Sequence, residues 1–465
     1  MIDIKLDELG TKVEQAMANM DADDAPKLFS VTKKIESLNP LHVFEGAKLF
    51  QKDRFYWMNS DRTLTITGVG SVRMLEAKNE RYRETEEQWR RLLKHAWVEN
   101  NYPDVPATGI VAFGGMDFDP LKRKTELWKH FKTALFYIPE IMLTVHHSDY
   151  YVTMNTLIDE ADRPQEVADR LVNLQEAFLK GKSIQDDAIT VVSRHEVEPE
   201  RWKQSVRKAM TEMQEEKAEK IVLAREMQLQ FERDVNIAQV LKTLYETQPD
   251  SYLFAFESEG DCFLGATPER LVKLEKNKLL SACLAGTAPR GKTKKEDEQI
   301  GQGLLNDKKN RDEHHFVVEM IRDALEKTCV DVQMPNAPVL RPLTNLQHLY
   351  TPVTGVLKEG YSIFDVVKHL HPTPALGGTP TNYSLRFIRD NEVLDRGWYG
   401  APIGWIDSDE NGEFAVAIRS ALIRGKKASL FAGCGVLPDS DPEMEFEETR
   451  IKMLPMLNVL GGHQE

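Results

Sequence analysis

The sequence predicts an α+β fold built on antiparallel sheets. Strand-like segments rich in apolar and β-branched residues follow one another at hairpin spacing, and amphipathic helical segments interrupt them. The GxGxxG fingerprint of a doubly wound dinucleotide-binding domain does not occur in the chain. These observations favour α+β over a doubly wound parallel sheet.

The N-terminal half mixes strands and helices. Residues 54–70 alternate around the turn-like Asn59-Ser60-Asp61, which predicts a hairpin. Residues 80–97 combine a charged face with an apolar stripe and predict an amphipathic helix. Further strands are predicted, in chain order, at residues 108–118, 136–147, 220–231, 251–258, 401–408, 412–423 and 428–436.

The chain has 465 residues, a length that often corresponds to about two to four domains. No long linker rich in proline, glycine and serine divides it, so we expect one globular unit. The weakest join is predicted at residues 181–202, where a polar stretch precedes a helix. We therefore expect a variable N-terminal part, residues 1–190, and a core, residues 191–465, within the same unit.

Charge and composition exclude several classes of partner. The formal net charge of −14 argues against nucleic acid and anionic membranes. The N-terminal segment is charged and amphipathic, unlike a signal peptide, and no apolar run is long enough to span a membrane, so we expect a cytoplasmic protein. The four cysteines lack CxxC spacing and are expected to be buried, reduced thiols: Cys262, Cys283, Cys329 and Cys434.

An acidic motif near the C-terminus suggests a metal site. On a helix, the spacing of Glu445, Glu448 and Lys452 places all three side chains on one face. Two carboxylates one turn apart can bind a hard cation, and all-oxygen ligation is typical of Mg²⁺. An isolated ExxE motif is more often a solvated acidic face, so the interpretation depends on the motifs that accompany it.

Four further motifs carry groups suited to chemistry. Glu313 directly precedes an apolar-periodic segment and should lie near the start of a helix, as a third carboxylate. Lys220 begins the predicted strand 220–231, where a lysine facing a core is costly. Glu269 follows Thr-Pro at a strand-to-turn junction. The pair Gly286-Thr287 can offer a backbone N–H and a hydroxyl to a carboxylate.

Three more motifs complete an ordered set: HPTPALGG at residues 371–378, VAIRS around Arg419, and FAGCGVLPDSDP before the glutamate helix. In this order the motifs resemble the chorismate-utilising enzymes over roughly residues 195–460, and most closely the isochorismate synthases of the menaquinone type. The resemblance implies two large antiparallel sheets stacked as a sandwich, peripheral helices and an active site in a deep cleft. It also implies chorismate as the substrate, with no obligate protein partner.

The resemblance assigns roles in a reaction that adds a hydroxyl at ring C2 and expels the one at C4. It implies that Lys220 activates water and that Glu269 protonates the leaving hydroxyl, which requires a raised pKa. The implied Mg²⁺ ligands, direct or through water, are Glu313, Glu445 and Glu448. The implied substrate-binding groups are Gly286 and Thr287 at the ring carboxylate, His348 near the ring, and Tyr399, Arg419, Gly433, Gly435 and Lys452 at the enolpyruvyl carboxylate.

Three alternatives stay open. Ammonia-using relatives, which are anthranilate or aminodeoxychorismate synthase components, carry glutamine at the position of Lys220 or a second lysine at that of Ala285. A salicylate synthase would go on to eliminate pyruvate, but Ala375-Leu376 resembles the members that stop at isochorismate. A non-catalytic protein of this fold should have lost Lys220 or a magnesium glutamate, and the sequence retains them all.

Overall fold

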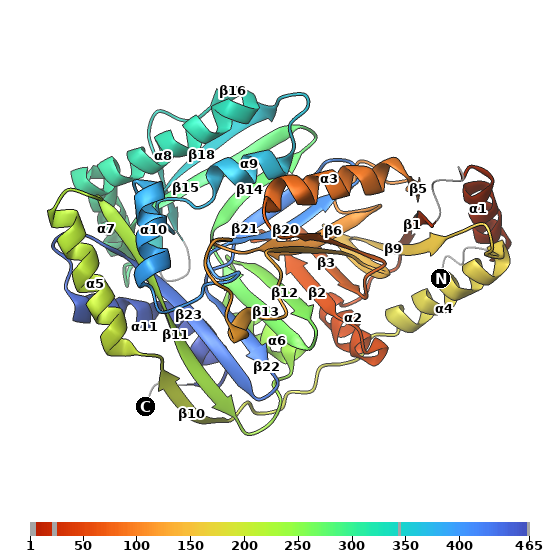
Figure 1. The fold of residues 1–465 in the computed structure, drawn as a ribbon, viewed down its shortest axis with the longest axis horizontal. Helices are drawn as coiled ribbons and strands as arrows, with labels where there is room; N and C mark the ends of the chain where they lie inside the picture. Colours follow the sequence, from red (N-terminus) through yellow and green to blue (C-terminus); the bar gives the residue numbers. More distant parts are fainter. Residues whose placement is uncertain (1–5, 21–25, 343–345, 463–465) are drawn as a thin grey trace.

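Two large sheets pack face to face in the structure, a computed structural model that describes residues 6–20, 26–342 and 346–462 (Figure 1). Within these residues the first sheet has 13 strands and the second has 10. All the strand pairs are antiparallel except β1 with β5. The predicted α+β sandwich is confirmed.

The first sheet runs, in spatial order, β10 (Val191–Glu196), β11 (Lys220–Phe231), β23 (Lys427–Val436), β22 (Ser420–Arg424), β13 (Asp261–Thr267), β12 (Tyr252–Ser258), β2 (Arg54–Met58), β3 (Leu64–Val69), β8 (Ile141–His146), β9 (Asp149–Ile158), β1 (Lys27–Ile35) and β5 (Ala96–Glu99), with β19 (Gly378–Thr379) paired to β11. The second runs β16 (Cys329–Gln333), β18 (Leu346–Leu357), β15 (Lys278–Pro289), β14 (Arg270–Glu275), β21 (Gly412–Val416), β20 (Pro402–Asp407), β6 (Val111–Met116), β7 (Ala134–Ile138) and β4 (Arg73–Ala77), with β17 (Val339–Pro342) paired to β18.

Helices surround the two sheets. They are α1 (Leu6–Ala18), α2 (Pro40–Gly46), α3 (Arg81–Lys94), α4 (Pro164–Leu179), α5 (Pro199–Gln214), α6 (Ile237–Thr247), α7 (Lys294–Asn306), α8 (Lys308–Thr328), α9 (Ile363–Leu370), α10 (Thr381–Asn391) and α11 (Pro442–Val459), with short 3₁₀ turns η1 (Ala47–Phe50) and η2 (Glu126–Trp128). Among the described residues no helix is long and apolar enough to cross a membrane.

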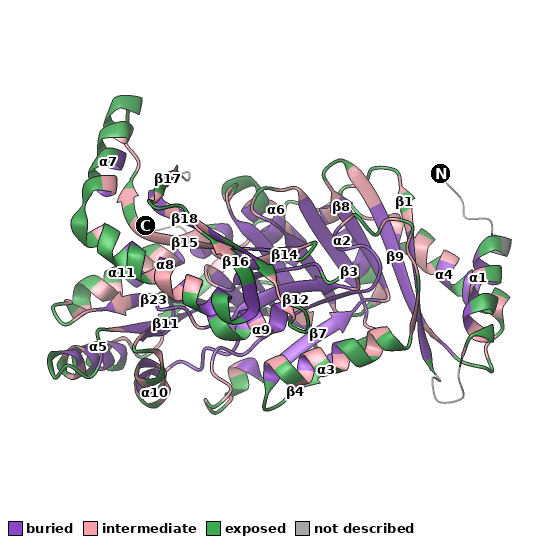
Figure 2. Ribbon diagram, turned by 90° about the horizontal axis from the view of Figure 1, so that it is seen from above, coloured by how far each residue is buried: buried purple, intermediate pink, exposed green. Residues whose placement is uncertain are grey.

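The side chains of β2 point alternately to the two sides of the first sheet and show how the core is built. Phe55 and Trp57 point toward the second sheet, where Phe113 of β6 stacks on Phe55 with ring centroids 4.7 Å apart. Tyr56 and Met58 point the other way, into a core that α6 and α11 complete. Successive side chains of a strand face opposite sides, so one strand supplies both layers of the core. In Figure 2 the buried strands accordingly run through the centre of the molecule.

Helices of different parts of the chain close the outer faces. On the second sheet the cover comes from α3, α8 and α9, whose apolar residues join one core with those of β4 and β15. At the far end, α1 and α4 pack over β1, β8 and β9 (Figure 1). Strands from before and after residue 190 therefore share both sheets, and the division of the chain at residue 190 stays a prediction.

Most predicted elements form where expected. The hairpin is β2–β3, closed by a hydrogen bond from the Asn59 amide to Leu64 O, and the charged helix is α3. Strand 136–147 was predicted as one piece, but Pro139 and Glu140 divide it into β7 of the second sheet and β8 of the first. Proline has no N–H for a ladder bond, so the chain leaves one sheet there. The four cysteines are free and buried, as predicted.

Strand 412–423 is also divided. β21 lies in the second sheet and β22 in the first, and residues 417–419 carry the chain across. Arg419 at this crossing has a φ of 51°, in the left-handed region that non-glycine residues seldom occupy. This crossing places Arg419 between the two sheets, at the candidate site.

Candidate active site

Lys220 is the first residue of β11 and lies over β23. In this pair Val222 is opposite Gly435, and Ala224 is opposite Gly433. A Cβ built on Gly435 would lie 2.4 Å from Lys220 Cε and 3.2 Å from its Nζ. The missing side chain at residue 435 therefore provides the space in which the lysine chain lies.

Lys452 ties α11 to the same strand. Its Nζ donates to the Gly433 carbonyl at 3.0 Å and forms a 2.6 Å ion pair with Glu448, one turn earlier on the helix. The Lys452 carbonyl in turn accepts a 3.2 Å hydrogen bond from an Arg419 Nη. The glutamate helix, β23 and the crossing between the sheets are thus held as one unit.

Glu269 faces Arg419 from the connection between β13 and β14. Burial raises the pKa of Glu269 to about 7, and the Arg419 guanidinium opposes this shift. Burial also lowers the pKa of Arg419, against the opposing pull of Tyr399, Glu269 and Glu448. Tyr399 is buried, which raises its pKa and keeps its phenol protonated as a donor. A carboxyl that holds a proton near neutrality is suited to be a general acid.

Gly286 and Thr287 form a bulge in β15 opposite His348 of β18. The register shifts between Ala285 and Thr287, and Gly286 has a φ of 76°, which glycine adopts without strain. Thr287 Oγ1 and His348 Nδ1 are 3.0 Å apart. Burial lowers the pKa of His348, a backbone hydrogen bond at Gly286 opposes this, and the positive charge of Arg419 adds to the lowering, which favours the neutral imidazole.

Glu313 lies exposed in the second turn of α8, which begins earlier than its apolar periodicity suggested, with Asp307 as N-cap. The neighbouring His314 is 2% exposed. Its Nδ1 is 3.0 Å from Ala285 O, and its Nε2 is 2.7 Å from Thr351 Oγ1. His314 therefore fixes the start of α8 to β15 and β18, beside the bulge.

The carboxylates fit a hard cation in part. Glu445 Oε1 accepts a 2.7 Å hydrogen bond from Ser440, whereas Oε2 is buried without a hydrogen-bond partner. Such an oxygen is costly unless something binds it. Among the described residues, however, no three His, Cys, Asp or Glu side chains are grouped closely enough to hold a metal, so Glu313 is not gathered with Glu445 and Glu448. The Mg²⁺ ligand set stays a prediction.

Three contributors to the site were not predicted from the sequence. Ser440 bonds to Glu445, His314 anchors α8, and the Cys434 thiol lies beside Glu445, where burial and that carboxylate hold its pKa above the usual range. A serine in a turn and a satisfied histidine carry no sequence signal of their own. Only the alternation of β23, which places Cys434 between Gly433 and Gly435, could have drawn attention to the thiol.

Residues 286–293 also match the phosphate-loop pattern GxxxxGK[ST]. The structure gives this segment another role. The amide of Gly291 donates to Asp297 Oδ1 and that of Lys292 to Glu296 Oε2, both at 2.8 Å. The backbone donors that would cradle a phosphate are therefore taken by carboxylates of α7, and the strand before the loop is antiparallel.

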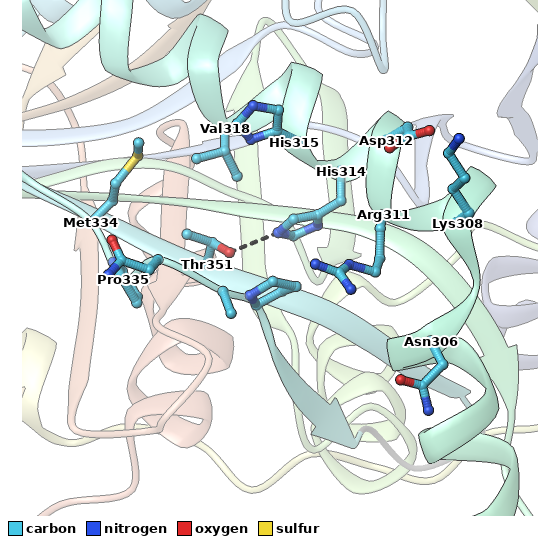
Figure 3. Close-up of a pocket in the computed structure, with 13 residues that line it drawn as sticks. Asn306, Lys308, Arg311, Asp312, His314, His315, Val318, Met334, Pro335 and Thr351 are labelled. Carbon is cyan, nitrogen blue, oxygen red and sulfur yellow. Dashed lines mark hydrogen bonds between the residues drawn. The ribbon is translucent and has the colours of Figure 1, made fainter.

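A pocket of about 510 Å³ lies against α8, between that helix, Thr351 of β18 and the residues after β16 (Figure 3). Arg311, His314, His315 and Val318 recur at helical spacing along its wall. None of the predicted site residues is among the lining residues that the structure describes. The predicted site lies instead along β11, β23 and β15.

The sequence profile of the family "Chorismate binding enzyme" matches residues 13–461. The isochorismate synthase MenF of Bacillus subtilis is 43% identical, over 94% of each chain. The salicylate biosynthesis isochorismate synthase of Pseudomonas aeruginosa is 35% identical, over 97% of this chain and 94% of that one.

Solved structures share the fold. The menaquinone-specific isochorismate synthase MenF of Escherichia coli superposes with a TM-score of 0.80 at 22% identity, over 97% of this chain and 100% of that one. Anthranilate synthase component I of Streptococcus pneumoniae has a TM-score of 0.67 at 19% identity, over 86% and 92%. The profile covers nearly the whole chain, and the ordered motifs lie within it; the protein belongs to the chorismate-binding enzyme family.

Proposed function

We propose that the protein is an isochorismate synthase, which converts chorismate to isochorismate with Mg²⁺ and feeds menaquinone biosynthesis. The observation that carries the proposal is the likeness to MenF of Bacillus subtilis, 43% identical over 94% of both chains. The site supports it, because Lys220 and the protonatable Glu269 supply the base and the acid that the reaction needs.

In the proposed reaction, Lys220 accepts a proton from water as the water oxygen attacks C2 of the ring. The two ring double bonds shift toward C4, and the C4–O bond breaks. Glu269 donates its proton to the departing hydroxyl, which leaves as water. One water enters and one leaves, so the reaction is an isomerisation. Deprotonated Glu269 then recovers a proton from solvent, and Lys220 releases one.

Binding groups hold the two carboxylates of chorismate in place. Arg419, Lys452 and Tyr399, with the backbone at Gly433 and Gly435, bind the enolpyruvyl carboxylate. Gly286 and Thr287 bind the ring carboxylate, with His348 neutral beside the ring. Because the chain carries a net charge of −14, these local donors must attract a dianion against the overall field.

Glu445, Glu448 and Glu313 would hold the magnesium ion. When bound, Mg²⁺ neutralises charge that develops on the ring carboxylate and so makes the ring a better electrophile. We also propose that the protein acts in the cytoplasm and needs no amidotransferase partner. Lys220 supports the second point, because it stands where the resembling ammonia-using enzymes carry glutamine.

Product analysis tests the proposal. The protein is incubated with chorismate, Mg²⁺ and ammonium chloride in H₂¹⁸O. The products are separated by chromatography, and their masses are measured by mass spectrometry. We expect isochorismate with one ¹⁸O atom. Salicylate with pyruvate, an amino product, or unchanged chorismate would each overturn the proposal in favour of a named alternative.

A further inference from the structure

We propose that Ser440 is a positioning residue that aims Glu445 at the divalent cation. Its hydroxyl holds one carboxylate oxygen and leaves the other facing the metal. The inference rests on the proposed role of Glu445 as a magnesium ligand, and it adds a residue that acts only through that ligand.

The hydrogen bonds of Ser440 fix the direction of its proton. The Leu437 amide donates to Ser440 Oγ at 3.0 Å, and the Ser440 amide donates back to Leu437 O at 3.1 Å. The hydroxyl is therefore held as an acceptor by the turn between β23 and α11. Its single proton goes to Glu445 Oε1 at 2.7 Å.

The second oxygen of Glu445 explains what this arrangement is for. Oε2 is buried and has no hydrogen-bond partner. A carboxylate oxygen in that state is costly, and a cation that binds it would remove the cost. The Cys434 thiol also interacts with the Glu445 carboxylate, but a thiol is a weak donor and does not satisfy a buried carboxylate oxygen as a cation would. With one oxygen held by Ser440, Glu445 would bind the cation through the other.

The neighbouring carboxylate, Asp441, has a structural role. Asp441 is the N-cap of α11 and accepts hydrogen bonds from the amides of Glu443 at 2.9 Å and Met444 at 3.0 Å. Both bonds go to Oδ1, which caps the start of the helix. Ser440 directly precedes this capping residue and bonds to Glu445, the proposed ligand, instead.

A matched control lies on β23, the strand that precedes the Ser440 turn. Ser429 of β23 donates to Glu226 Oε1 of β11 at 2.6 Å, so it makes the same kind of serine-to-glutamate hydrogen bond in a buried setting. Neither residue of this pair belongs to the predicted site. If Ser440→Ala loses metal affinity and Ser429→Ala does not, the loss is specific to the bond between Ser440 and Glu445.

The experiment measures Mg²⁺ binding by isothermal titration calorimetry for the wild type, Ser440→Ala, Ser440→Thr and Ser429→Ala. Outer-shell partners typically change metal affinity about 10- to 100-fold, so we expect a loss of that size in Ser440→Ala. Ser440→Thr keeps the hydroxyl and should bind like the wild type, as should Ser429→Ala. The kcat of Ser440→Ala should recover at saturating Mg²⁺.

The outcomes separate the two levels of the proposal. If the wild type binds no Mg²⁺, the metal assignment itself fails. If the wild type binds it and Ser440→Ala binds equally well, or loses activity that Mg²⁺ cannot restore, Ser440 is only structural and the inference is overturned. If Ser440→Ala does not fold, Ser440→Cys replaces it. The thiol is a weaker donor than the hydroxyl, so this variant should bind Mg²⁺ more weakly than the wild type. An affinity equal to that of the wild type would also overturn the inference.

Discussion

The Lys220 side chain occupies the space that a side chain at Gly435 would fill. A Cβ at residue 435 would come within 2.4 Å of Lys220 Cε, and the three nearest atoms to that Cβ all belong to this lysine. The residue proposed to activate water is therefore positioned by the absence of a methyl group on the neighbouring strand.

We expect Gly435→Ala to fold normally and to lose activity by about 10²-fold, because the new methyl group displaces a flexible side chain by more than an ångström. Steady-state kinetics and a thermal melt measure the two effects. Gly303→Ala is the control, since nothing lies within 4 Å of a Cβ there. In the double variant with Lys220→Gln, Gly435→Ala should cause little further loss of activity. A normal kcat in Gly435→Ala alone would show that Gly435 does not position Lys220.

Lys220→Gln should lower isochorismate formation by roughly 10²- to 10⁴-fold, the usual range for loss of a positioned general base. The KM for chorismate should change little, because other residues are proposed to bind its two carboxylates. Lys217→Gln, on the surface turn before β11, serves as the control. If Lys220→Gln retains most of its activity, another group activates water.

The pH profile should report Glu269. Burial raises its pKa to about 7, and the acid is active in its protonated form. The proposed acid must be protonated while the proposed base Lys220 is neutral, so we expect the profile of kcat/KM against pH to contain a limb near pH 7 that belongs to Glu269. Glu269→Gln cannot donate the proton, so it should bind chorismate but turn over slowly, without that limb. Near-normal turnover of this variant would remove Glu269 from the mechanism.

The same group should make stability depend on pH. The folded pKa of Glu269 lies above its ordinary value of 4.5, so between pH 4.5 and about 7 the folded state binds more protons than the unfolded state. Its contribution to the free energy of unfolding therefore falls as the pH rises across this window. Urea denaturation at pH 5 and pH 8 should show Glu269→Gln gaining stability relative to the wild type at the higher pH. An unchanged difference would place Glu269 in contact with solvent.

Glu313→Ala should abolish Mg²⁺-dependent activity without unfolding the protein, because the side chain is exposed and makes no core contact. The adjacent Asp312→Ala is the matched control, since Asp312 lines the pocket of Figure 3. Titrating Mg²⁺ into both variants separates the two positions. Full activity of Glu313→Ala in limiting Mg²⁺ would show that Glu313 is not a ligand, and would leave Glu445 and Glu448 of α11 as the proposed ligands.

Sequence patterns were strong where a local rule decides the structure. The hairpin at residues 54–70, the start of β11 at Lys220 and the helix that carries Glu445 and Glu448 all follow from periodicity and turn residues. The patterns did not predict where the chain changes sheet, at Pro139 and at Arg419. Strands of both sheets have the same alternation of apolar residues, so the pattern does not tell to which sheet a strand belongs. The choice between them depends on packing partners distant along the chain.

By itself the sequence determined the α+β class, the buried reduced cysteines and the chemical groups available to the site. Only the tertiary structure decided how those groups act on one another. Burial raises the pKa of Glu269 although Arg419 opposes the shift, Gly435 leaves the space for Lys220, and Ser440 bonds to only one of the two Glu445 oxygens. Desolvation and steric fit depend on atoms that folding brings together, and no local pattern of residues encodes them.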